Sequence, residues 1–134
     1  MVWCYLSAPA EVQAWVERAE EDCLVATSAL RRKRPLTVTS CFHAQQCAEK
    51  YLKAILLAKG RSFPKTRDLR LLNNLCGEAD VWVEVDVMRL DSLSFYAVHA
   101  RYPGDEPTVE QAHDGLKTAK AVRRFARKWL GLTL

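Results

Sequence analysis

Apolar residues recur every three or four positions along most of this 134-residue chain. A repeat of this length places the apolar side chains along one face of an α-helix, whereas a half-buried strand alternates at every second residue. The five prolines fall between the periodic stretches, and the chain has only five glycines. The pattern therefore predicts a few long helices rather than many short strands.

Proline, glycine and capping residues indicate where these helices begin and end. The first helix, which starts near Ser7 to Pro9, should end before Pro35 because a residue preceding proline disfavours the helical region. Gly60 is a natural stop for the second helix, and Thr66 can cap the third. The expected helices span about residues 9–34, 37–59, 67–77, 84–100 and 107–130, and the second of them could instead begin at residue 39. We expect a single all-α domain over residues 1–134, an antiparallel up-and-down four-helix bundle with one additional short helix.

Residues 81–87 are the least helical part of this pattern. Their sequence, VWVEVDV, alternates as a strand would. A lone strand without a partner elsewhere in the chain would leave its backbone hydrogen-bonding groups unpaired. We therefore expect a loop here, followed by a helix from about Glu84.

Charge and cysteine content narrow the class of protein. The formal net charge of +4 permits binding to a polyanion without requiring it. The five cysteines form no CxxC pair and are odd in number, which indicates reduced thiols in a reducing compartment. No signal peptide is recognised, and the apolar run at residues 54–58 is too short to span a bilayer. The sequence predicts a cytoplasmic protein without a membrane partner.

Three segments resemble one known family. They are HAQQCAEKYLKA at residues 43–54, FPKTRDL at residues 63–69 and ARYP at residues 100–103. Together they resemble the HEPN domains (higher eukaryote and prokaryote nucleotide-binding), over about residues 10–130. The resemblance implies a helical bundle that is often a homodimer and is often encoded with a small nucleotidyltransferase. It thus implies a homodimer, a possible nucleotidyltransferase partner in a toxin–antitoxin pair, and nucleotide or RNA as ligand.

Many members of this family are ribonucleases, described by an arginine followed four to six residues later by a histidine. Here Arg89 meets His99 only after nine intervening residues, and Arg101 is next followed by His113. Arg67 also stands where the family often has histidine. RNA cleavage needs a base that titrates near neutral pH, for which histidine is the natural choice. We therefore assign no catalytic residue and leave open whether the chain is an enzyme.

The candidate nucleotide- or RNA-binding residues are His43, Lys50, Lys53 and Arg101. The first three lie at helical spacing on the second helix, where they should form an outward cationic strip. Arg101 is expected at a helix end, where it could bind a phosphate or cap the helix carbonyls. A solvated or dimer-packed face explains the strip equally well. No metal or cofactor is predicted, because His43 and Cys47 offer two ligands one turn apart without a third.

Three hypotheses follow. The leading one is a HEPN-like protein that binds nucleotide or RNA phosphates, with one half of a toxin–antitoxin pair as its possible role. The second is a metal-independent endoribonuclease toxin in which His99 or His113 serves the cleavage step. The third is a non-catalytic helical module that recruits a partner protein. The last helix also carries a basic stripe, which could bind phosphates or could simply face solvent. It consists of Lys117, Lys120, Arg124 and Arg127.

Overall fold

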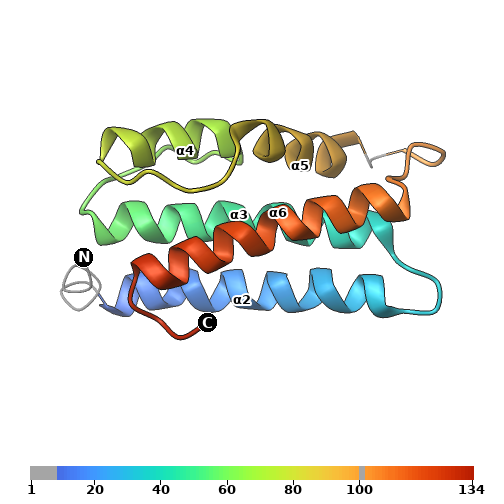
Figure 1. The fold of residues 1–134 in the computed structure, drawn as a ribbon, viewed down its shortest axis with the longest axis horizontal. Helices are drawn as coiled ribbons and strands as arrows, with labels where there is room; N and C mark the ends of the chain where they lie inside the picture. The colour runs from blue at the N-terminus through green and yellow to red at the C-terminus, as the bar shows by residue number, and fades with distance from the viewer. Residues whose placement is uncertain (1–8, 100–101) are drawn as a thin grey trace.

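The computed structural model describes residues 9–99 and 102–134, and every regular element in that part of the chain is a helix. The helices are α2 (Pro9–Arg31), α3 (Thr37–Ala58), α4 (Leu69–Glu78), α5 (Val87–His99) and α6 (Val109–Trp129). In Figure 1, α2 and α3 lie side by side, α6 crosses them, and α4 and α5 follow one another along the other side of α3. The predicted all-α bundle with an additional short helix is confirmed.

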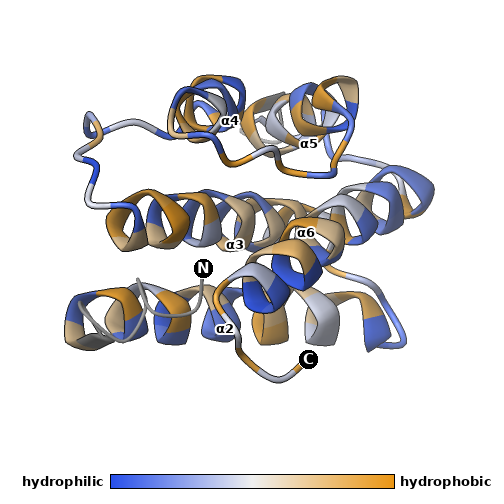
Figure 2. Cartoon of the chain, turned by 60° about the vertical axis from the view of Figure 1, so that its left-hand side comes forward, coloured by the Kyte–Doolittle hydropathy of each residue, from blue (hydrophilic) through white to orange (hydrophobic). Residues whose placement is uncertain are grey.

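Helix α3 is the centre of the bundle, because it packs against each of the other four helices. Its fully buried side chains include Tyr51, Leu52 and Ile55. In the turns before these large residues, the alanines Ala44 and Ala48 are also fully buried, and their small side chains let the neighbouring helices approach closely. In Figure 2, apolar and polar segments alternate along each helix, as expected of helices that bury one face. No helix among the described residues is both long and apolar enough to cross a membrane.

Several helix ends differ from the sequence expectation. Asp68, rather than Thr66, is the N-cap of α4 and accepts a hydrogen bond from the Leu71 backbone N–H. The Thr66 hydroxyl instead accepts from the Asp68 backbone N–H, so both residues shape the same turn. Helix α4 also continues past Gly77 to Glu78, and the chain turns at Asp80, which has a φ of 63°.

The last two helices also begin later than expected. Helix α5 begins at Val87 rather than Glu84, because Asp86 accepts a hydrogen bond from the Met88 backbone N–H and fixes that start. Helix α6 begins after Thr108 rather than at Pro107, since Thr108 and Gln111 form a reciprocal capping box.

A polar network ties α2, α3 and α6 together across the core. The Arg123 guanidinium donates two hydrogen bonds to the Glu20 carboxylate, at 2.7 and 3.0 Å. The Tyr51 hydroxyl donates to the same carboxylate and accepts from Arg127. Burial raises the pKa of Glu20, but the hydrogen bonds from Arg123 and Tyr51 outweigh it and leave that pKa below its ordinary value. The carboxylate therefore stabilises the folded state in its charged form.

We expect the replacement Glu20→Gln to lower the free energy of unfolding at pH 7 by about 1 kcal/mol, the scale of a hydrogen-bonded ion pair partly screened by solvent. Because the folded pKa lies below the unfolded value of 4.5, the contribution is present above about pH 4.5. It is lost as the pH falls through the folded pKa. Urea denaturation at pH 7 and pH 3 should show that the difference in free energy of unfolding between wild type and variant becomes smaller at pH 3.

The matched control is Glu17→Gln, an exposed carboxylate on the same helix. It should leave the stability nearly unchanged at both pH values. If Glu20→Gln lowered the free energy of unfolding equally at pH 7 and pH 3, the role given to this carboxylate would be contradicted.

Candidate functional site

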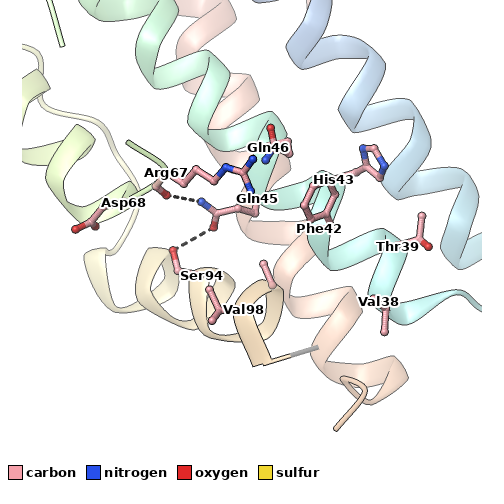
Figure 3. A pocket seen from close by; sticks show the side chains of 11 residues that line it. Val38, Thr39, Phe42, His43, Gln45, Gln46, Arg67, Asp68, Ser94 and Val98 are labelled. Atoms are coloured by element: carbon pink, nitrogen blue, oxygen red, sulfur yellow. Dashed lines mark hydrogen bonds between the residues drawn. The ribbon is translucent and has the colours of Figure 1, made fainter. Parts of the chain in front are cut away.

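A groove of about 620 Å³ lies between the first half of α3, the loop before α4 and the second half of α5. This volume is in the range of small-ligand sites. Its apolar wall includes Val38 and Phe42 of α3 and Val98 of α5, while Gln46 and Arg67 provide polar groups. Figure 3 shows these side chains gathered along the groove.

Gln45 holds the walls of the groove together. Its amide nitrogen donates to the Arg67 backbone carbonyl at 2.7 Å, and its amide oxygen accepts from the Ser94 hydroxyl at 3.1 Å. Figure 3 shows both bonds as dashed lines. Gln45 is buried, so these bonds satisfy both ends of its amide. The loop that carries Arg67 and the helix that carries Ser94 are thereby fixed relative to α3.

Phe42 and Arg67 are the groove residues best suited to a planar, anionic ligand. Phe42 is 42% exposed, and its ring offers an apolar face beside the groove. Arg67 is exposed, and its side chain extends over α3 toward Gln46 (Figure 3). Neither residue was among the predicted binding residues, although Arg67 lies in the FPKTRDL segment that resembles the family motif.

His43 and Lys50, two of the predicted binding residues, are joined by one carboxylate of α2. Asp22 Oδ1 lies 2.8 Å from His43 Nδ1, and Asp22 Oδ2 accepts from Lys50 Nζ at 2.6 Å. Both side chains keep part of their surface in solvent, and His43 also lines the groove on the α2 side of Phe42 (Figure 3). The negative charge of Asp22 therefore offsets much of the positive charge that was predicted for this strip.

The expected outward orientation is wrong for Lys53. This residue is 5% exposed, and its ammonium donates to Glu49 Oε2 at 2.8 Å. The rings of Trp15 and Phe63 cover the ammonium, each with its centroid 5.4 Å away. The aromatic residues of α2 and of the α3–α4 loop thus enclose this end of the strip. Glu49 and the two rings therefore occupy the positions from which a phosphate would approach the Lys53 ammonium.

The remaining candidate, Arg101, lies outside the described residues. Helix α5 ends at His99, one residue after Val98, which lines the groove. His113, by contrast, is exposed on α6 and is not among the groove residues.

The basic stripe on α6 is only partly a free surface. Arg127 donates to the Tyr51 hydroxyl and to the Thr133 backbone carbonyl, so it belongs to the core network. Lys117 and Arg124 are exposed. The stripe is therefore a partly committed basic face, whereas the groove combines a concave shape with aromatic and cationic side chains.

The chain is similar to known proteins in both sequence and structure. Residues 12–129 match the HEPN domain. The chain is 30% identical over 132 residues to a protein of Methanocaldococcus jannaschii named "Putative toxin MJ1304", covering 87% of this chain and 86% of that protein. It is also similar to the crystal structure of TT1696 from Thermus thermophilus, with a TM-score of 0.66 and 26% identity, covering 87% of this chain and 96% of that one.

Proposed function

Because this chain belongs to the HEPN domain family, we propose that it is a toxin-type HEPN protein whose α3–α5 groove binds a nucleotide or the nucleotides of an RNA strand. The observation that carries the proposal is the meeting of an exposed aromatic ring and an arginine along one concave surface. Aromatic side chains stack on bases, and arginine binds phosphate through its planar fork.

Each part of a nucleotide has a matching group in the groove. Phe42 would stack on the base, and the Arg67 guanidinium would pair with a phosphate. Gln46 would supply an amide donor and acceptor for the base edge or the sugar. His43 would approach from the α2 side, held in place by its bond to Asp22. Arg101 remains a predicted phosphate ligand where the chain leaves α5.

The toxin part of the proposal rests on the named relative from Methanocaldococcus jannaschii. A nucleotidyltransferase partner would then serve as the antitoxin, and a second copy of this chain would complete the active form. Exposed apolar residues of α2, of the α2–α3 loop and of the start of α3 support such an assembly, and they are Leu24, Val25, Leu36 and Val38.

Binding of an RNA strand should depend on Arg67. We expect Arg67→Ala to weaken the affinity for a fluorescently labelled oligoribonucleotide about tenfold, or about 1.4 kcal/mol. Loss of one phosphate contact should also reduce the salt dependence of the affinity by about one unit of slope. Fluorescence anisotropy at several salt concentrations measures both quantities.

The control is Arg61→Ala, an exposed arginine in the same loop that does not line the groove. It removes the same net charge and should change the affinity much less. Equal weakening by Arg61→Ala and Arg67→Ala would mean that only the overall charge attracts RNA, and the groove assignment would fail.

A protein-interaction module is the second candidate, favoured by the exposed apolar wall of the same groove. Phe42 and Val98 could receive the side chains of a partner helix. In that case Arg67→Ala would leave RNA affinity unchanged, while Phe42→Ala would weaken a heterocomplex with the partner.

A further inference from the structure

The α3–α5 groove continues into a second groove on the α2 side of α3. This second groove has a volume of about 370 Å³ and is lined by α2, the α2–α3 loop and the first turn of α3. Thr39 lines both grooves. In Figure 3, Thr39 lies at the opposite end of the α3–α5 groove from Arg67. A long ligand that starts at Arg67 would therefore pass Thr39 and enter the second groove.

A run of four cations borders the second groove. Arg32 lines this groove, and its neighbours in the run are exposed as it is. The run consists of Arg31, Arg32, Lys33 and Arg34. No aspartate or glutamate occurs in the sequence between Asp22 and Glu49. This segment of the chain therefore carries positive charge without local neutralisation.

The four cations are also free of ion pairs within the part of the chain that the structure describes. Other cations of the molecule have carboxylate partners, and these are Lys50, Lys53, Arg70, Arg89, Arg123 and Arg127. A cation that pairs with a carboxylate must give up that partner to bind a phosphate. The run at residues 31–34 is available without this cost, and its position next to the groove gives a phosphate chain a path to it.

The junction between the two grooves adds polar groups to this path. Helix α3 begins there at Thr37, with no side-chain cap and no acidic residue in its first turn. The N–H groups of a first helical turn have no acceptor inside the helix, so they are open to an anion. The Thr39 hydroxyl has no hydrogen-bond partner among the described residues. These groups supplement the loop cations, which supply the charge.

We infer that the ligand of the groove is a single RNA strand several nucleotides long, which runs from Phe42 and Arg67 past Thr39 to the cations at residues 31–34. Proteins bind single strands by combining stacking on aromatic rings with cations that follow the backbone. Phe42 would stack on one base, and the run of cations would contact the phosphates of the following nucleotides. This inference rests on the function proposed for the groove and selects an RNA strand over a mononucleotide as its ligand.

The experiment compares a dinucleotide, which occupies the α3–α5 groove, with a hexanucleotide, which also extends to the loop. Both are 2′-O-methylated oligouridylates, so no 2′-hydroxyl is present to attack the phosphodiester during the measurement. Isothermal titration calorimetry with the wild-type protein should give about tenfold or more tighter binding for the hexanucleotide. Equal affinity for the two lengths would overturn the inference.

The variant Arg32→Ala/Arg34→Ala assigns the gain to the loop. It should weaken binding of the hexanucleotide about tenfold and leave the affinity for the dinucleotide within about twofold. The salt dependence for the hexanucleotide should fall by about 1.4 units of slope, since each phosphate contact of a single strand contributes about 0.7. The variant keeps Arg31, the basic residue in the last turn of α2. Circular dichroism checks that its helices are intact.

The matched control is Lys117→Ala/Arg124→Ala, which removes the same charge from two exposed cations of α6. It should weaken binding of the hexanucleotide much less than the loop variant does. Equal weakening by the two double variants would mean that only the overall charge attracts RNA, and the path would be rejected. Unchanged hexanucleotide affinity in the loop variant would also reject it and would leave this face to a protein partner.

Failure of the proposed function has a different signature. In that case Arg67→Ala leaves the affinity for the dinucleotide unchanged, or the wild-type protein does not bind the dinucleotide at all. If instead Arg67→Ala weakens dinucleotide binding while the loop variant changes nothing, the groove remains a nucleotide site and only the extended strand is excluded. A loss in the loop variant without any effect of Arg67→Ala would place RNA on the loop alone, which contradicts a strand that starts in the groove.

Discussion

Replacing Lys53 by methionine is expected to lower the free energy of unfolding by about 3–5 kcal/mol, as measured by urea denaturation at pH 7. The cost comes from Glu49, which is 6% exposed and would lose its ion-pair partner. Among the described residues, Glu49 Oε1 already has no hydrogen-bond partner. The carboxylate would therefore remain buried with little to compensate its charge. This outcome would make Lys53 a structural residue rather than a free phosphate ligand.

The double variant Glu49→Leu/Lys53→Met tests whether the loss of stability comes from leaving the Glu49 charge unpaired. A well-packed apolar replacement of a buried ion pair is often neutral, so we expect this variant to lie within about 1 kcal/mol of the wild type. Lys50→Met, which removes a more exposed partner of Asp22, is the matched lysine control and should cost less than Lys53→Met. A Lys53→Met protein as stable as the wild type would contradict the structural role.

Simultaneous loss of the aromatic and cationic groups of the groove is expected to abolish toxicity. If the chain acts as a toxin through the groove, its expression should arrest growth, and Phe42→Ala/Arg67→Ala should restore growth to that of cells with an empty vector. Stacking on one base contributes about 1–3 kcal/mol, and a phosphate contact adds to it. The double variant should therefore lose about a hundredfold or more in affinity. Growth curves after induction measure the effect.

The matched control is Met88→Ala/Arg61→Ala, which removes one exposed apolar residue and one arginine outside the groove. This protein should arrest growth as the wild type does. Immunoblots establish that all three proteins accumulate equally. Growth arrest that persists in the groove variant at equal abundance would separate toxicity from this surface.

The helices were predictable because their apolar period repeats over many residues, and each of the five ends within three residues of its expected bounds. The ends were less predictable where two residues compete for one role. Thr66 and Asp68 both suit a cap, and only the geometry of the turn gives the Leu71 N–H to Asp68. Residues 81–86 alternate like a strand but form a loop whose buried Val81 packs in the core.

The site was less predictable, because its electrostatics depend on contacts between helices. His43 and Lys50 meet Asp22, which lies 21 and 28 residues earlier on α2. No pattern within α3 reveals that partner. Lys53 follows the same helical spacing, yet Trp15 and Phe63 enclose it from two other elements. Gln45 is buried, and only the fold shows that its amide joins Arg67 to Ser94.

The position of a bound RNA strand tests the central claim most directly. An oligoribonucleotide containing 4-thiouridine, cross-linked to the protein by near-ultraviolet light, can be located by mass spectrometry of the linked peptides. If RNA binds in the groove, we expect cross-links to the α3 peptide that contains Phe42 and to the loop peptide that contains Arg67. Cross-links confined to the exposed face of α6 around Lys117 and Arg124 would contradict it.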